Sequence, residues 1–321
     1  MGSRVDAMTE QSPATTLVRW SGRTQAFVER QDGLVLTLLR IPAGVFLMGS
    51  PAHEAERFDR EGPQHPVRLG EFLMAQTPIT QAQWRVVAGW EAKAGEVWGR
   101  ELLPNPSWFQ IEGEASTDQR PVEQVTWLDA MEFCHRLRQR TGRTYTLPSE
   151  AQWEYACRAG TITPFHFGHT LTPDLANYGG NDSAASGPSV EAPKQTTPVG
   201  MFPANAWGLQ DMHGNVQEWC LDHWHKSYER APADGRAWLN KAWLSNEEPT
   251  EMNQALQSTQ ASEPENYPQY RMVRGGGWRT SPTGCRSAFR PFFQADSVDT
   301  SLGFRVVCLP PTPPPSTTLD P

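Results

Sequence analysis

The alternation of hydrophobic and polar positions predicts two β-segments near the start of the chain. Residues 33–49 are rich in Leu, Val and Ile, and Pro42 and Gly44 interrupt them, which favours two strands joined by a turn. Three later segments begin with a capping box, a hydroxyl side chain followed three positions on by a residue that can bond back. The capping boxes start at Thr80, Thr126 and Ser149. We therefore expect three helices after the strands.

Helical periodicity is clear in the second of these helices and is lost after the third. Ala130, Phe133, Cys134 and Leu137 recur at helical spacing, so they share one apolar face. Beyond Gly160 the chain is dominated by Gly, Pro, Asn, Asp and Trp for more than a hundred residues. This pattern indicates loops held by specific contacts, with many of the 13 tryptophans filling the core between them.

The polar stretches suggest how the chain is organised. Residues 1–30 form a polar N-terminal segment that we expect to be partly disordered, and residues 31–308 form a single domain. Within that domain, 236–269 is a Glu/Gln/Ser-rich insertion. Residues 309–321 form a Pro-rich tail.

Charge and composition exclude several classes of function. The formal net charge is −8 and no Lys/Arg-rich block occurs, which argues against a nucleic-acid partner. The sequence has no run of about 18 apolar residues, so no membrane span is expected. The five cysteines are scattered without CxxC spacing, and no secretory signal is visible at the N-terminus, which together favour reduced thiols in a cytoplasmic protein.

The C-terminal region has an unusual composition between two conventional ends. Residues 274–278 read Arg-Gly-Gly-Gly-Trp and 303–307 read Gly-Phe-Arg-Val-Val, which together resemble a rigid frame. The intervening residues 279–302 contain no Lys, Glu, Met or Trp and one Gln, yet include Phe289, Phe292 and Phe293. Surface loops usually show the reverse, so this segment is a candidate binding surface.

An ordered set of motifs resembles the formylglycine-generating-enzyme (sulfatase-modifying factor) domain family. The motifs are 41–50 (IPAGVFLMGS), 120–127 (RPVEQVTW), 147–155 (LPSEAQWEY), 208–219 (GLQDMHGNVQEW) and the C-terminal frame. The resemblance covers roughly residues 34–308. It implies an α+β domain of the formylglycine-generating-enzyme-type C-type lectin fold, with little regular secondary structure.

The resemblance also implies a specific chemistry that this sequence lacks in part. Enzymes of the family oxidise a substrate cysteine through copper(I) held by two cysteines of the C-terminal loop. One of these positions is Cys285, but the other is Thr280, and a hydroxyl is a poor ligand for copper(I). We therefore expect no copper and no catalysis. The alternative is a metal-dependent oxidase of a protein cysteine or small thiol that uses Cys285.

A second branch of the same fold is similar in its C-terminal loop. In the variable proteins of diversity-generating retroelements, adenine-specific mutagenesis rewrites this loop, and the resulting NNC codons cannot encode Lys, Glu, Gln, Met or Trp. Residues 279–302 nearly obey that exclusion, with Gln294 as the exception. The similarity implies a non-catalytic ligand-binding protein whose loop 278–302 is diversified and binds a protein or peptide.

The candidate ligand-binding residues are those expected to present side chains from this loop. They are Trp278, Arg279, Thr280, Ser281, Thr283, Gly284, Phe289, Pro291, Phe292, Phe293, Ala295, Ser297, Val298 and Thr300. If they form the surface, replacing Phe292 and Phe293 by Ala should abolish binding and leave the melting temperature nearly unchanged. Two plainer interpretations stay open: an ordinary loop of an inactive paralogue, and a scaffold domain whose partner docks on 236–269.

Oxygen-bearing residues suggest structural calcium. Asp211, Asn215 and Glu218, with the carbonyl of His213, lie at close spacing on an expected turn, which suits a hard cation. The resemblance implies a second site at Asn177 and the Tyr178 carbonyl. The mixed-charge run 54–59, in contrast, is expected to be a solvated loop.

Overall fold

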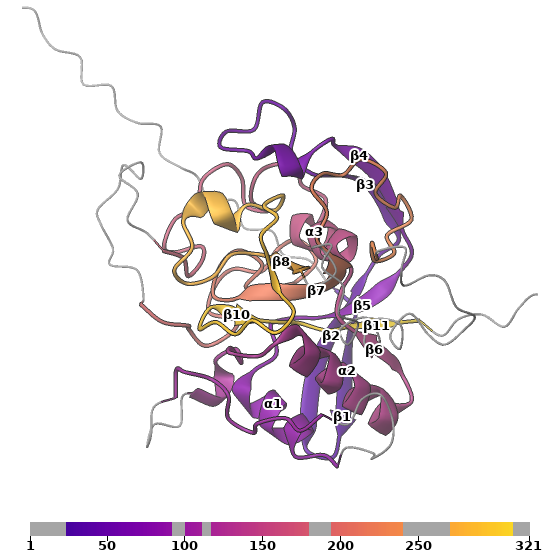
Figure 1. Cartoon of the computed structure of the whole chain (residues 1–321), viewed down its shortest axis with the longest axis vertical. Helices are drawn as coiled ribbons and strands as arrows, with labels where there is room; N and C mark the ends of the chain where they lie inside the picture. Colours follow the sequence, from indigo (N-terminus) through magenta and orange to yellow (C-terminus); the bar gives the residue numbers. More distant parts are fainter. Residues whose placement is uncertain (1–23, 92–99, 111–116, 180–193, 240–269, 311–321) are drawn as a thin grey trace, which may run out of the picture.

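The computed structural model describes residues 24–91, 100–110, 117–179, 194–239 and 270–310. The expectations for the first 23 residues, for 240–269 of the polar insertion and for 311–321 lie outside these described residues. Figure 1 shows the described chain as curled sheets and a few helices joined by long irregular segments. The expected α+β class, with little regular secondary structure, is confirmed.

The largest sheet joins the two ends of the described chain. Its strands, in spatial order, are β1 (Ala26–Gln31), β2 (Leu34–Ile41), β5 (Phe72–Ala75), β11 (Val307–Leu309) and β6 (Thr144–Thr146). All neighbouring pairs are antiparallel. Because β11 lies between β5 and β6, the C-terminal frame is held inside the sheet that the N-terminal strands begin.

A second sheet carries the C-terminal loop. Its order is β10 (Leu302–Gly303), β7 (Gln217–His223), β8 (Tyr270–Arg274) and β9 (Phe292–Gln294). The loop leaves the sheet after β8, contributes β9 at the edge and returns as β10 beside β7. A separate hairpin pairs β3 (Gly44–Met48) with β4 (His65–Leu69). The two predicted strands are therefore present, and Pro42 and Ala43 separate β2 from β3 where the chain passes from one sheet to the other.

The three predicted helices are present and each begins with the expected capping box. They are α1 (Gln81–Ala88), α2 (Trp127–Thr141) and α3 (Glu150–Arg158). In each, the side chain of Thr80, Thr126 or Ser149 accepts the backbone N–H three residues on, and that residue bonds back. Short 3-10 turns include η1 (Asp59–Glu61), η2 (Thr117–Gln119) and η5 (Pro282–Cys285).

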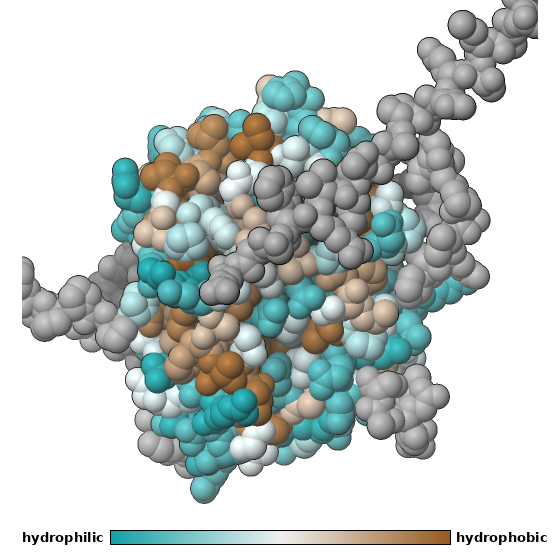
Figure 2. All heavy atoms as spheres, turned by 180° about the vertical axis from the view of Figure 1, so that it is seen from behind, coloured by the Kyte–Doolittle hydropathy of each residue, from teal (hydrophilic) through white to brown (hydrophobic). Residues whose placement is uncertain are grey.

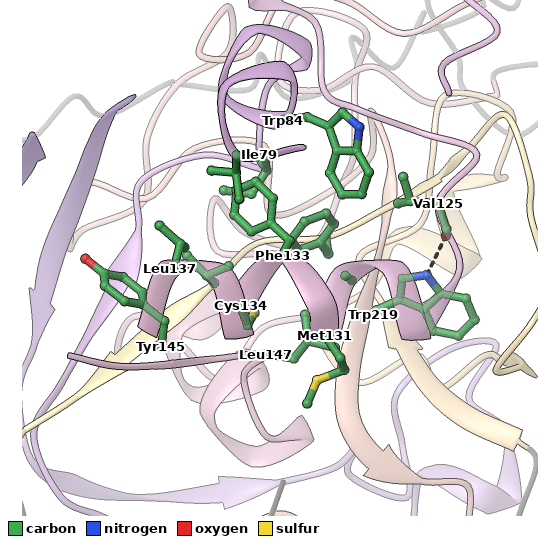
Figure 3. Close-up of a cluster of buried hydrophobic side chains, with 14 of the residues drawn as sticks. Ile79, Trp84, Val125, Met131, Phe133, Cys134, Leu137, Tyr145, Leu147 and Trp219 are labelled. Atoms are coloured by element: carbon green, nitrogen blue, oxygen red, sulfur yellow. Dashed lines mark hydrogen bonds between the residues drawn. The ribbon is translucent and has the colours of Figure 1, made fainter. Parts of the chain in front are cut away.

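Aromatic rings from distant segments fill the core, as the Trp content suggested. Trp84 of α1 stacks on Phe133 of α2 with 5.7 Å between ring centroids and 6° between planes. Trp219 of β7 donates from its indole nitrogen to the Val125 carbonyl at 3.0 Å, which satisfies its polar atom (Figure 3). These aromatic contacts in the core therefore join helix α1 to helix α2 and strand β7 to the segment before α2.

The surface of the described residues is mixed. Figure 2 shows apolar patches separated by polar ones on the face opposite to that of Figure 1. Among the described helices, none has the length and apolarity needed to cross a membrane.

Candidate functional site

Buried arginines anchor the C-terminal loop to helix α3. Arg290, inside the loop, donates to both carboxylate oxygens of Glu150 at 2.6 and 2.9 Å. Arg274, at the end of β8, donates to Glu150 at 3.1 Å and also pairs with Glu154. Burial alone would raise the pKa of Glu150, but the charges of Arg290 and Arg274 hold that pKa below its ordinary value. The loop is thus tied to the domain by charge-assisted bonds.

A third arginine ties the loop to the segment between β3 and β4. Arg286 donates to Glu54 at 2.5 Å and to the two oxygens of Glu61 at 2.7 and 2.8 Å. All three side chains are buried. The expectation that residues 54–59 form a solvated loop is therefore wrong at Glu54, because that carboxylate neutralises a buried guanidinium of the C-terminal loop.

The glycine frame makes room for Cys285. A Cβ atom at Gly276, whose φ is +68°, would lie 2.5 Å from the Cys285 sulfur. The Cys285 Sγ lies 3.9 Å from the Thr280 carbonyl oxygen, so the two positions compared with the copper ligands are neighbours. Cys285 is fully buried, and this burial raises its pKa. One buried thiol with a threonine at the second position does not fit the two-thiolate copper(I) site.

The three loop phenylalanines are partly buried and each faces a different partner. Phe293 packs against the main core and meets Trp219 edge-on at 6.3 Å. Phe292, on the opposite face of β9, packs against Trp224 with 4.6 Å between the ring centroids. The ring centroids of Phe289 and Phe58 lie 5.6 Å apart. The contacts of Phe293 with the core contradict the expectation that this ring can be replaced by Ala with the melting temperature nearly unchanged.

The two ends of the loop meet at Trp278. Its indole nitrogen donates to the Thr300 carbonyl at 3.0 Å, and its ring meets Phe109 edge-on at 5.5 Å. Arg279 pairs with Asp299 across the same junction. The indole is half-buried, so it braces the loop and keeps one side open to solvent.

The candidate residues differ in exposure. Arg279 and Val298 are exposed, whereas Gly284 and Ala295 are buried and present no side chain outward. The remaining ten are half-buried: Trp278, Thr280, Ser281, Thr283, Phe289, Pro291, Phe292, Phe293, Ser297 and Thr300. The structure thus brings most of the loop's candidate side chains to the surface with one side packed.

The oxygen atoms considered for calcium are not equally available. Both carboxylate oxygens of Glu218 accept from Arg305, at 2.6 and 2.7 Å, and one also accepts from the Trp153 indole at 2.8 Å. A guanidinium in this position competes with a cation, so Glu218 does not fit a calcium site. Asn215 is occupied as well, since its side chain exchanges hydrogen bonds with the Thr197 backbone.

Two of the oxygens considered for calcium keep their capacity to accept. Asp211 Oδ2 accepts from the Gly200 N–H at 2.7 Å, while Asp211 Oδ1 and Asn177 Oδ1 are buried without a partner among the described residues. Burial raises the pKa of Asp211 to about 6. At His213 and Tyr178 the predicted ligands are the backbone carbonyls. Their side chains are engaged elsewhere, the His213 ring with the Cys285 carbonyl at 2.8 Å and the Tyr178 hydroxyl with the Leu171 carbonyl. In the part of the chain that is described, no three His, Cys, Asp or Glu side chains cluster as a metal site.

Sequence reasoning missed residues outside the loop that border its surface. Phe58 and Arg60 lie against Phe289, and exposed Trp108 precedes Phe109, the partner of Trp278. Phe58 is the one aromatic residue within the charged run 54–59, and this alone does not predict a contact with the C-terminal loop. Neither position has a motif that ties it to residues more than 150 positions away.

Comparison with known proteins agrees with this architecture. Residues 24–309 match the Sulfatase-modifying factor enzyme 1-like domain. The formylglycine-generating enzyme of Mycobacterium tuberculosis is 26% identical over 324 aligned positions, covering 86% of this chain and 99% of that protein.

Two solved structures share the fold. PvdO from Pseudomonas aeruginosa superposes with a TM-score of 0.67 at 28% identity, covering 90% of this chain and all of PvdO. Treponema denticola variable protein 1 superposes with a TM-score of 0.60 at 23% identity, covering 89% of this chain and 99% of the variable protein. The domain match, the motif order and the shared architecture together place this chain in the sulfatase-modifying factor (formylglycine-generating enzyme) domain family.

Proposed function

We propose that this protein is a non-catalytic ligand-binding member of the family, whose binding surface is the C-terminal loop 278–302. The observation that carries the proposal is the separation of roles within the loop. Arg286 and Arg290 are buried and paired with carboxylates of the domain, while Arg279 and Val298 are exposed and Phe292 is half-buried. Such a loop keeps its path when its surface side chains change, as antibody loops do.

The proposal extends to the origin of the loop as a diversified segment. The shared fold with the Treponema variable protein is consistent with it, but the support comes from the near-absence of residues that NNC codons cannot encode. Buried Arg286 and Arg290 restrict variation to the positions around them. The ligand is a protein or peptide, because half-buried phenylalanines supply contact area at low entropic cost.

Sequencing the gene's own locus tests this origin. A near-copy of the codons for 278–302 that differs only at adenines, beside a reverse-transcriptase gene, is the expected result. Codons for Arg286 and Arg290 should be identical in the copy and the gene. A locus without such a copy would contradict the proposal and return the segment to an ordinary loop.

The competing function is a metal-dependent oxidase that uses Cys285. The juxtaposition of Cys285 and Thr280 favours a common ancestry with the copper site, but the single buried thiol opposes metal binding. Copper(I) titration under reducing conditions separates the two. Binding at a stoichiometry of one that disappears in Cys285→Ala would support the oxidase, whereas we expect no such binding.

Two further expectations belong to this proposal. Structural calcium is proposed at two sites, one that uses the unpartnered oxygen of Asp211 and one that uses that of Asn177, and it would stabilise loops without catalysing a reaction. A cytoplasmic location fits five buried cysteines that form no disulfide with one another.

A further inference from the structure

Arg60, in η1, is a half-buried cation whose neighbouring acids are already engaged. Its Nε atom is buried and has no hydrogen-bond partner among the described residues. The carboxylate of Asp59 faces Arg57 at 3.7 Å, and both oxygens of Glu61 accept from Arg286. The guanidinium of Arg60 is therefore partly desolvated and has no anion of its own within the part of the chain described.

Two aromatic rings hold this guanidinium from one side. Its central carbon lies 4.6 Å from the Phe58 ring centroid and 5.4 Å from that of Phe289, and the two centroids are 5.6 Å apart. These three distances form a nearly equilateral triangle, so the cation rests against a pair of rings and is not enclosed between them. Cation–π contact orients the group, and because the side chain is half-buried, part of it remains accessible to a ligand.

The electrostatic surroundings leave the cation undersatisfied. Burial lowers the pKa of Arg60, and the nearby charges of Arg290 and Arg286 lower it further, against the opposing charge of Glu61. Both of those arginines are committed to carboxylates, at Glu150 and at Glu54 and Glu61. An added anion at Arg60 would gain a charge-assisted hydrogen bond that no group in the described chain supplies.

We propose that Arg60, backed by Phe58 and Phe289, is an anion-binding anchor that receives a carboxylate of the protein ligand. The inference rests on the proposed function, since Phe289 belongs to the C-terminal loop. A carboxylate fits better than a phosphate because one partly accessible guanidinium matches a single planar group, and phosphate sites gather several free cations. Arg60 and Phe58 lie outside the diversified loop, so these two residues of the anchor stay constant, whereas Phe289 can change with the loop.

The test uses the full chain labelled with ¹⁵N, and follows the Nε–Hε resonances of its arginines at pH 6 and constant ionic strength. Acetate, inorganic phosphate and chloride serve as probes in separate titrations. We expect acetate to shift the Arg60 resonance, identified by its loss in Arg60→Lys, along a saturable curve with a dissociation constant on the order of millimolar to tens of millimolar. Exposed Arg30 of β1 is the internal control and should shift little and without saturation.

Each alternative result overturns a stated part of the inference. Equal, non-saturating shifts at Arg60 and Arg30 would show that no site exists. Saturation by phosphate at lower concentration than acetate would show that the ligand group is a phosphate. In Phe58→Ala, acetate affinity should fall several-fold, and an unchanged affinity would remove the rings from the anchor. Acetate binding without a template copy at the locus would preserve the anchor and reject the diversified loop, so the two proposals fail separately.

Discussion

Arg290 and Glu150 lie 140 residues apart in sequence and form a buried two-point ion pair, with nitrogen–oxygen distances of 2.6 and 2.9 Å. Arg290 belongs to the candidate binding loop, and Glu150 is the first residue of α3. The helix N-terminus adds no benefit to the guanidinium, so the carboxylate is what holds it there. The pair therefore attaches the loop to the core at Arg290.

Removing this guanidinium should destabilise the whole domain. In Arg290→Met, Glu150 keeps Arg274 and the Tyr228 hydroxyl as partners, so we expect a loss of about 3 kcal/mol in the free energy of unfolding. The matched control is Arg279→Met, whose pair with Asp299 is half-exposed and should cost less than about 1 kcal/mol. Urea denaturation at pH 7 measures both. Equal losses in the two variants would contradict an anchoring role for Arg290.

The two neighbouring phenylalanines of β9 should behave differently. Phe293 packs on the main core, so Phe293→Ala should cost about 2 to 3 kcal/mol. Phe292 lies against Trp224 and Tyr270 on the other face of β9, so Phe292→Ala should lower the free energy of unfolding by about 1 kcal/mol. Thermal denaturation of each single variant checks this order. A larger loss for Phe292→Ala would place that ring in the core and remove it from the binding surface.

The contribution of Glu123 to stability should decrease as the pH rises toward neutrality. Burial raises the pKa of this carboxyl to about 7 from 4.5, against hydrogen bonds from Phe109 and Trp108, and Asp299 raises it further. The native state therefore holds the proton more tightly than the unfolded state, which stabilises the fold fully below pH 4.5 and progressively less up to pH 7. The contribution is at most about 3 kcal/mol.

The variant Glu123→Gln isolates this contribution. Relative to the wild type, the variant should lack a contribution to the unfolding free energy that falls between pH 4.5 and pH 7, which denaturation of both proteins at several pH values measures. Asp211 and Asp222 also have raised pKa values, about 6 and about 7, so some pH dependence should remain. Burial lowers the pKa values of His166, His213 and His225, and their contribution to stability rises with pH over the same range. An unchanged slope in Glu123→Gln would show that Glu123 is ionised across this range.

Calcium binding has a direct thermal readout. If Asp211 holds an ion, millimolar calcium should raise the melting temperature by a few degrees, because a ligand bound only by the native state stabilises it. Asp211→Asn should abolish that increase, and Glu218→Gln should not be used as a control because Glu218 pairs with Arg305. Asp174→Asn, on an exposed turn, is the matched control. An equal rise in the Asp211 variant would reject this site.

Local sequence patterns determined the helices, the early strands and the family. Capping boxes at Thr80, Thr126 and Ser149 act over three or four residues, so their consequences can be read directly from the chain. The ordered motifs likewise predicted the α+β fold, and the unusual composition of 279–302 identified the loop as the segment of interest.

Only the tertiary structure decided how that loop is held and what borders it. The pairs of Arg290 with Glu150 and Arg286 with Glu54 join residues more than 100 positions apart, and no local pattern encodes a buried ion pair. The same holds for Arg60 beside Phe289, and for the inward face of Phe293. A buried charge requires a partner, and which residue supplies it depends on the segments that the fold brings together.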